Sequence, residues 1–167
     1  CEGLSDLSDS YMGWILDQWG VLHDGNKPYD GVIEALQELK KRKKQIILLS
    51  NSGKRAKTNA DRLEKIGFDV SLFTDIITSG EMTWQGLKNR DEGIFKGLGD
   101  QCLLFSRQND TAILDGCGIS VVDTVEKADF ILMSGIDRVD KQLSDYEPYL
   151  REGVRKGLKM ICANPDM

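Results

Sequence analysis

Two short apolar runs in this sequence each end in polar side chains that could take part in chemistry. The run Trp14-Ile15-Leu16 stops at Asp17, and the run at 45–49 stops at Ser50-Asn51-Ser52, just before a helical pattern. An apolar run that ends at a carboxylate is typical of a buried strand with this side chain at its carboxyl end. Hydroxyl and amide groups ahead of a helix, together with its first N–H groups, form an anion site. The same residues also suit strand and helix ends without any chemistry, because Ser and Asn are common helix caps.

The segments between these residues predict the elements that position them. Apolar strands without alternation are separated by helical patterns, in the order strand, helix, strand, helix, strand. The expected helices are 31–39, 54–66 and 81–88, and the expected third strand is 75–79. This order predicts a parallel sheet with both faces covered. Ligands of such sheets lie beyond the carboxyl ends of the strands, so Asp17 and Ser50-Asn51-Ser52 are expected at one edge.

A second unit of the same class is expected after a glycine-rich boundary at 91–99. Its predicted strands are 102–105, 119–122, 130–133 and 159–163. A short helix is expected before Gly116 and a longer one at 146–156. The whole chain is therefore assigned to the α/β class.

The composition argues against several kinds of partner. The chain has 167 residues, a net charge of -5 and a pI near 5.0, which disfavours a nucleic-acid surface. No apolar run approaches the ~18 residues of a membrane span. Four scattered cysteines without a C-x-x-C pair, and a single histidine, argue against a structural zinc site. No secretory signal is recognised, so we expect reduced, mostly buried thiols and a cytoplasmic protein.

The string at 17–25, Asp-Gln-Trp-Gly-Val-Leu-His-Asp-Gly, closely resembles motif I of phosphatases in the haloacid dehalogenase-like (HAD) superfamily. It has the class IIA form, in which a second glycine follows three residues after the Leu. The resemblance implies that Asp17 attacks phosphorus and becomes a phospho-aspartate. It also implies that Gly20 contributes to substrate binding. Asp17 and the main-chain carbonyl of Trp19 would bind Mg²⁺.

The residues at 46–52 resemble motif II of the same family, a hydrophobic strand that ends in Thr or Ser followed by Asn. The resemblance implies that Ser50 donates a hydrogen bond to the transferring phosphoryl group. Asn51 and Ser52 would then line the substrate pocket.

The adjoining Gly53-Lys54 could instead suggest a nucleotide-binding P-loop. That motif needs Gly where this sequence has Leu48, and Ser or Thr where it has Arg55. The P-loop interpretation is therefore rejected.

The resemblance continues through the second half of the chain. Class IIA members carry a large α/β cap after the third core strand, and the segments 128–137 and 161–166 match its strand patterns in order and spacing. We therefore expect residues 1–82 to form the N-terminal part of a Rossmann-like HAD core. Residues 83–167 are expected to form part of an α/β cap of the C2 type. Both would be incomplete, so the chain is expected to be an N-terminal portion of a longer polypeptide and inactive alone.

This sequence departs from the family pattern at the second position of motif I. The residue two after the nucleophile is normally Asp, the general acid and base, and here it is Trp19, which cannot exchange a proton near neutral pH. His23 is a weaker candidate for a replacement proton carrier. The family's Lys motif and acidic magnesium loop would lie beyond residue 167. Asp17 and one carbonyl are too few donors for Mg²⁺.

Three functions fit these observations. The leading hypothesis is a magnesium-dependent phosphatase of small phosphorylated, sugar-phosphate-like metabolites, similar to NagD-type and p-nitrophenyl-phosphatase-type members. The alternative is a non-catalytic HAD-like protein that binds a phosphorylated ligand after losing its acid and base at Trp19. A third is an enzyme that uses the same nucleophile on another bond. A homo-oligomer is compatible with all three.

Overall fold

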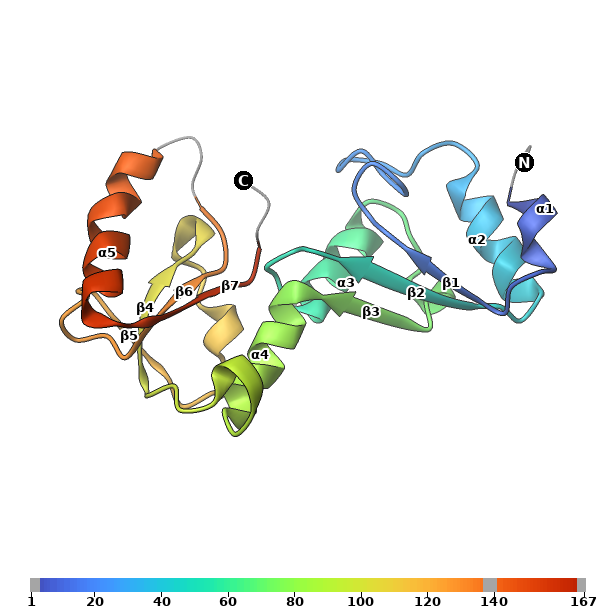
Figure 1. Cartoon of the computed structure of the whole chain (residues 1–167). Helices are drawn as coiled ribbons and strands as arrows, with labels where there is room; N and C mark the ends of the chain where they lie inside the picture. The colour runs from blue at the N-terminus through green and yellow to red at the C-terminus, as the bar shows by residue number, and fades with distance from the viewer. Residues whose placement is uncertain (1–3, 137–140, 165–167) are drawn as a thin grey trace. The chain divides into compact units, whose positions relative to one another are not determined.

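The computed structural model describes residues 4–136 and 141–164, and its contacts divide the chain into two units (Figure 1). The first unit comprises residues 1–50 and 56–78, and the second comprises residues 51–55 and 79–167. The sequence features at Cys1, Asp137 and Pro165-Asp166 lie outside the described residues. Assignment of residues 1–82 to a core and 83–167 to a cap stays a prediction, because contacts alone do not define these roles.

The first unit is built on a parallel sheet with the strand order β1-β2-β3. These strands are β1 (Gly13–Leu16), β2 (Gln45–Ser50) and β3 (Asp75–Thr78). Between them lie α2 (Val32–Lys41), α3 (Ala56–Lys65) and the 3₁₀ turn η1 (Val70–Leu72). The predicted alternation of strands and helices is confirmed, as is the parallel direction of the strands.

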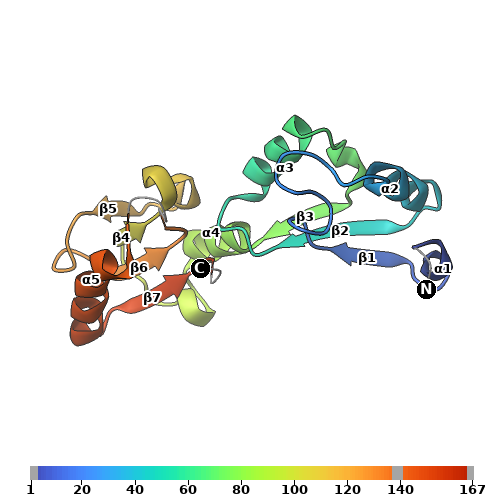
Figure 2. The same ribbon diagram turned by 90° about the horizontal axis from the view of Figure 1, so that it is seen from above.

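Helices α2 and α3 lie on the same side of this sheet (Figure 2). Leu36 and Leu39 of α2 and Leu63 of α3 are buried in one cluster with Ile46 and Leu48 of β2. Fully burying a leucine or isoleucine side chain contributes about 1.5–3 kcal/mol, so this cluster is the main stabilising feature of the first unit.

The opposite face of the sheet is open within the described residues. Ile15 of β1 is 68% exposed and Leu49 of β2 is 48% exposed. The expectation that both faces are covered is therefore wrong for the described part of the first unit. The apolar run could not reveal this, because β2 is apolar on both sides although only alternate residues of it are buried.

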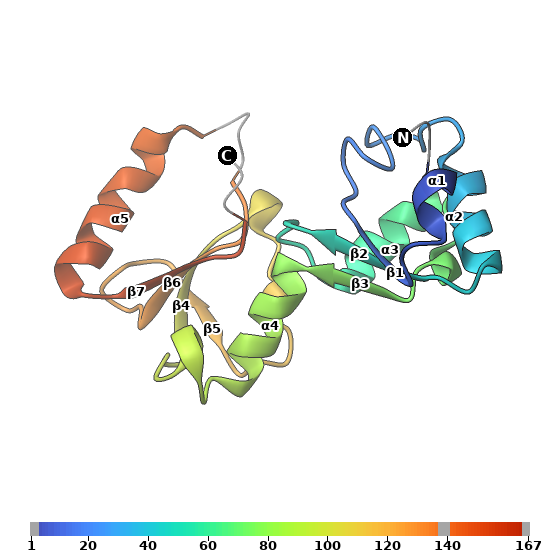
Figure 3. The same cartoon turned by 45° about the vertical axis from the view of Figure 1, so that its right-hand side comes forward.

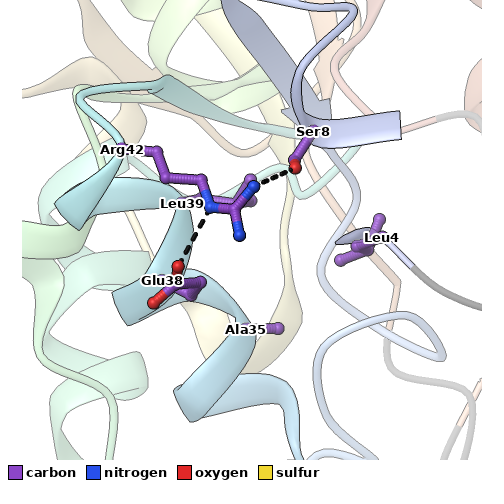
Figure 4. Close-up of a pocket in the computed structure, with 6 residues that line it drawn as sticks. All are labelled: Leu4, Ser8, Ala35, Glu38, Leu39 and Arg42. Atoms are coloured by element: carbon purple, nitrogen blue, oxygen red, sulfur yellow. Dashed lines mark hydrogen bonds and ion pairs between the residues drawn. The ribbon is translucent and has the colours of Figure 1, made fainter. Parts of the chain in front are cut away.

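The short helix α1 (Ser5–Ser8) is held against α2 by Arg42 (Figure 4). Its Nη1 donates to Ser8 Oγ at 2.7 Å and its Nε donates to Glu38 Oε1 at 2.9 Å. A cavity of about 230 Å³ lies beside these bonds. It is lined by Leu4, Ser8, Ala35, Glu38, Leu39 and Arg42. None of these residues was predicted as a site residue. The hydrogen bonds of Arg42 serve the packing of α1 against α2.

The second unit is built on a four-stranded parallel sheet with the order β5-β4-β6-β7. Its strands are β4 (Gln101–Phe105), β5 (Ser120–Val122), β6 (Phe130–Met133) and β7 (Lys159–Cys162). Its helices are α4 (Ser79–Asn89) and α5 (Leu143–Lys156). Shorter 3₁₀ turns are η2 (Gly93–Phe95), η3 (Arg107–Asn109) and η4 (Ala112–Leu114).

Both faces of this second sheet are covered, because α4 and α5 lie on opposite sides of it (Figure 3). Leu87 of α4 is buried in one cluster with Phe130 and Leu132 of β6. On the other face α5 approaches β6 closely at Gly153, where an added Cβ would lie 2.6 Å from Ile131 Cδ1. A larger residue here would force the ends of the Ile131 and Met160 side chains to shift.

One predicted element of the second unit is wrong. The short helix expected before Gly116 is replaced by the two separate turns η3 and η4. Gln108 and Asn109 both have a φ of 55°, and this left-handed conformation interrupts a right-handed helix.

The described cysteines are free thiols. Cys102 and Cys117 are buried and Cys162 is exposed. Burial raises the pKa of the Cys102 thiol to about 12, so it is protonated and unreactive at neutral pH. None of the described helices has the length and apolarity needed to cross a bilayer.

The neighbouring residues Leu48 and Leu49 test the one-sided packing of the first sheet. Leu48→Ala should lower the free energy of unfolding of the 167-residue chain by about 2–5 kcal/mol, because Leu48 is fully buried. Leu49→Ala, which removes the same atoms from the open face, should cost much less. Urea unfolding followed by tryptophan fluorescence measures both. Equal losses would contradict an open face at Leu49.

Candidate active site

Asp17 and Ser50 lie at the same edge of the first sheet. In the parallel register Leu16 pairs with Leu48, and Asp17 is the first residue after β1. Ser50 is the last residue of the neighbouring strand β2, and adjacent strands are about 4.8 Å apart. Asp17 is exposed and Ser50 is 9% exposed. The two predicted catalytic residues are therefore brought together at the carboxyl ends of neighbouring strands.

A compact loop follows Asp17 and fixes the orientation of its carboxylate. The N–H of Gln18 donates to Asp17 Oδ1 at 2.7 Å. The Gln18 carbonyl accepts from the N–H groups of Val21 at 3.3 Å and Leu22 at 2.8 Å. Gly20 has a φ of +78°, a conformation that glycine adopts without strain, and its N–H donates to the His23 carbonyl at 2.9 Å. The N–H of Gly20 is thus engaged inside the loop.

The main chain of Trp19 is not used by the hydrogen bonds that close this loop. Trp19 and His23 form a parallel bridge, whose bonds run through the Gln18 carbonyl and the Gly20 N–H. In the described residues, no backbone N–H donates to the Trp19 carbonyl. The hydrogen bonds of the loop therefore leave the Trp19 carbonyl oxygen available as a ligand for a cation.

The indole of Trp19 is an exposed ring beside the nucleophile position. It is 65% exposed, and an added Cβ at Gly25 would lie 3.1 Å from its Cη2. The guanidinium of Arg62, on α3, lies 5.8 Å from the ring centre, and its Nη2 donates to the Gly25 carbonyl at 3.4 Å. The ring therefore lies beside Gly25 and Arg62 with most of its surface exposed, and it has no ionisable group of its own.

His23 is buried beneath the loop and is only 3% exposed. Its Nδ1 accepts a hydrogen bond from the Gly25 N–H at 3.0 Å, so this nitrogen carries no proton. Burial, and then the positive charge of Arg62, lower the pKa of His23, while Asp24 and Asp17 oppose the shift. His23 is thus neutral at pH 7, and its position gives it a structural role in the loop.

The described residues do not by themselves form a magnesium site. They contain no group of three or more His, Cys, Asp or Glu side chains that could hold a metal ion. The Asp17 carboxylate and the Trp19 carbonyl supply three oxygen atoms at most, whereas Mg²⁺ demands near-octahedral coordination. Further protein ligands of a magnesium ion at this edge would have to come from outside the described residues.

The predicted substrate-pocket residues Asn51 and Ser52 follow Ser50 directly in the chain. Their contacts belong to the second unit. The Ser52 carbonyl accepts from the Gly80 N–H at 2.9 Å, and Ser52 Oγ accepts from the Lys54 N–H at 3.2 Å. The hydrogen bond from the Lys54 N–H to Ser52 Oγ closes a local turn, which is common for a Ser just before a helix.

Sequence reasoning missed Arg62, which contacts two residues of the nucleophile loop. Arg62 lies on the helical run of α3 among other charged residues, and nothing in its local sequence distinguishes it from them. Only the packing of α3 against the sheet brings it near Trp19.

The parallel sheet, with Asp17 and Ser50 at its carboxyl edge, defines an α/β protein whose candidate site lies at the strand ends. Residues 14–120 match the sequence model of the haloacid dehalogenase-like hydrolases. The chain belongs to this family, as the motif resemblance predicted. A search of curated proteins found no match.

Solved structures agree with this assignment. A haloacid dehalogenase-like hydrolase from Brucella suis 1330 matches 99% of this chain with 28% identity and a TM-score of 0.86. A 4-nitrophenylphosphatase from Thermotoga maritima matches 96% with 23% identity and a TM-score of 0.70. A glycerol phosphate phosphatase from Mycobacterium tuberculosis, in complex with magnesium, matches 96% with 18% identity and a TM-score of 0.69. The last two matches show the fold alone.

The chain covers only part of these relatives. It spans 60% of the Brucella protein, 57% of the Thermotoga protein and 46% of the Mycobacterium protein. The fold and the family are therefore established for this chain.

The pKa of the single histidine tests the electrostatics of the loop. We expect His23 to titrate below its ordinary value of 6.5 in ¹H–¹⁵N NMR spectra, because burial disfavours its charged form. Stability should consequently fall as the pH drops below 6.5, where the unfolded chain binds a proton that the folded chain does not. Arg62→Gln should raise the pKa, since it removes a nearby positive charge. Lys65→Gln, on the same helix, is the matched control. A midpoint at or above 6.5 would contradict this account.

Proposed function

We propose that the complete protein is a phosphatase that hydrolyses small phosphorylated, sugar-phosphate-like metabolites through a phospho-aspartate at Asp17. The observation that carries the proposal is the meeting of Asp17 and Ser50 at the carboxyl edge of a parallel sheet in a haloacid dehalogenase-like chain. The names of two structural relatives, a 4-nitrophenylphosphatase and a glycerol phosphate phosphatase, support the class of reaction.

In the proposed reaction the free carboxylate oxygen of Asp17 attacks phosphorus. Its other oxygen, Oδ1, accepts the Gln18 N–H, which holds the carboxylate in one orientation. A bond forms between Asp17 and phosphorus while the bond to the leaving oxygen breaks, and the electron pair stays with that oxygen. Water then attacks the phospho-aspartate and releases inorganic phosphate. Ser50 donates a hydrogen bond to a phosphoryl oxygen, with Asn51, Ser52 and Gly20 lining the substrate pocket.

The leaving oxygen receives no proton from the side chain at position 19. Trp19 has no ionisable group, so the oxygen leaves as an anion and takes its proton from water. Activated esters with acidic leaving groups need little protonation. The proposed enzyme should therefore favour such substrates over alkyl phosphates.

Several further features of the complete protein are proposed with this function. Magnesium dependence is supported by the magnesium complex of a structural relative, with Asp17 and the Trp19 carbonyl as donors and further ligands from outside residues 1–167. Residues 1–82 are proposed as part of the core and 83–167 as part of a C2-type cap. A cytoplasmic location, a possible homo-oligomer, and the absence of nucleic-acid and membrane partners complete the proposal.

Asp17→Asn tests the nucleophile in the complete protein. It keeps the shape of the side chain but removes the attacking carboxylate, so hydrolysis of p-nitrophenyl phosphate and binding of beryllium fluoride should both be lost. Asp30→Asn removes an equal charge from an exposed position and should leave both unchanged. Turnover of Asp17→Asn at the parent rate would remove Asp17 from the mechanism. A parent protein that binds phosphate without turning over esters would favour the alternative, a non-catalytic phospholigand-binding protein.

Trp19→Asp tests the missing acid. General acid–base assistance typically contributes about 10²–10⁴-fold, so a restored carboxylate should raise the rate on an alkyl phosphate far more than on p-nitrophenyl phosphate. Trp19→Asn is the matched control. Its side chain is as small as that of Asp but has no carboxyl group, so it shows the effect of losing the indole alone. Steady-state kinetics on both substrates and a thermal melt of each variant measure the effect. A folded Trp19→Asp protein with no gain on the alkyl ester would falsify the missing-acid explanation.

A further inference from the structure

The segment 51–55, directly after the strand that ends in Ser50, is anchored from several parts of the second unit. The Gly80 N–H, in the first turn of α4, donates to the Ser52 carbonyl at 2.9 Å. Lys54 forms an ion pair with Asp110, which lies between η3 and η4. These elements are far apart in the sequence, so the segment is held by tertiary packing and not by its own turn.

Two glycines allow the backbone to pack closely at this segment. An added Cβ at Gly80 would overlap the Gly53 carbonyl and lie 2.6 Å from the Lys54 carbonyl oxygen. An added Cβ at Gly53 would overlap the Ser134 carbonyl oxygen, at the end of β6. Backbone atoms cannot move aside as a flexible side chain can, so both glycines are required by this packing.

Arg55 ties the end of the segment to α4 through two interactions. Its Nε donates to Glu81 Oε2 at 2.6 Å and its Nη2 donates to Glu81 Oε1 at 3.2 Å. The side chains of Arg55 and Glu81 are only 22% and 17% exposed. The guanidinium also lies 3.6 Å from the centre of the Trp84 ring, one turn further along α4. A bidentate, partly buried pair of this kind fixes both partners more firmly than an exposed pair does.

Trp84 is itself held in place, so it offers Arg55 a fixed surface. Its Nε1 donates to the Asp115 carbonyl at 2.7 Å. The ammonium group of Lys88 lies 4.8 Å from the centre of the same ring. Arg55 is thus the point at which the segment meets a rigid part of α4.

We propose that Arg55 is a positioning residue for phosphate recognition, acting with Glu81 and Trp84 to hold the Asn51–Arg55 segment in its binding geometry. This inference rests on the proposed function, because Asn51 and Ser52 are the proposed substrate-pocket residues that Arg55 would position. Arg55 itself need not touch the substrate. A misplacement of about 1 Å at a remote support can cost roughly 10²-fold in rate, which makes this backbone sensitive to its anchor.

The test compares Arg55→Ala, Arg55→Lys and Glu81→Gln with the parent in the complete protein. Arg55→Ala should lower kcat/KM for p-nitrophenyl phosphate and the affinity for inorganic phosphate by roughly 10- to 100-fold. Arg55→Lys should rescue little, since Lys keeps the charge but lacks the planar fork that pairs with Glu81 and stacks on Trp84. The double variant Arg55→Ala/Glu81→Gln should lose less kcat/KM and phosphate affinity than the two single variants combined, because the two residues act as a pair.

A matched control and a structural measurement separate positioning from general stability. Lys57→Ala removes an equal charge from an exposed ion pair on α3 and should change nothing. Hydrogen exchange of the amides of residues 51–55 should be faster in Arg55→Ala than in the parent, with the melting temperature recorded alongside. A variant that melts earlier but keeps parental kcat/KM, phosphate affinity and exchange at 51–55 would overturn the inference.

The same measurements distinguish failure of the inference from failure of the proposed function. A parent protein that neither hydrolyses phosphate esters nor binds phosphate defeats the proposed function, and the role of Arg55 in phosphate recognition falls with it. An active parent whose Arg55→Ala variant is equally active defeats the inference alone. An active parent with a selective loss in Arg55→Ala, little rescue by Lys and faster exchange at 51–55 supports both.

Discussion

The parallel pairing of β1 with β2 is the constraint on which the candidate site depends. Its hydrogen bonds set Leu16 opposite Leu48, and this register ends both strands at the same edge. A shift by one residue would turn every side chain of β1 to the other face of the sheet. Burial of alternate residues against α2 and α3 resists such a shift, because it would bring Ile15 into the core and expose Trp14 and Leu16. The position of Asp17 beside Ser50 is therefore a consequence of core packing.

The loop after Asp17 combines a rigid backbone with an unusual side chain. Hydrogen bonds to the Gln18 carbonyl, and the left-handed Gly20, fix the path of the chain without help from the side chain at position 19. An indole can therefore replace a carboxylate there while the loop stays closed. Packing of Trp19 against Gly25 and Arg62 fits a large flat ring, whereas the proton of the missing acid has no substitute in a neutral, buried His23. In the proposed reaction, Trp19 therefore removes the acid of motif I, while the hydrogen bonds of the loop keep its backbone framework.

The sequence predicted what local patterns control and missed what long-range packing controls. Apolar runs located β2 and its end at Ser50, and motif spacing located Asp17 at the end of β1. The open face at Ile15 and Leu49 escaped prediction, because an apolar strand looks the same whether one or both of its faces are covered. The Arg55–Glu81 pair joins residues on different elements, and neither residue belongs to a local pattern that points to the other. The catalytic roles of Asp17 and Ser50 stay predictions.

A single peptide bond separates two kinds of support for the proposed phosphate site. Ser50 is held by the β-sheet of the first unit, through its pairing with Thr78 of β3. Asn51 belongs with the second unit, whose α4 anchors the segment through Gly80 and Glu81. Ser50 is fixed by the hydrogen bonds of the sheet, whereas the segment 51–55 is fixed by a partly buried ion pair, so the two supports can be perturbed by different substitutions. The two supports differ in chemistry, so a loss of phosphate affinity can be traced to one of them. Substitutions in the sheet should lower the affinity by unfolding the first unit, whereas substitutions at the Arg55–Glu81 pair should lower it by displacing the segment 51–55.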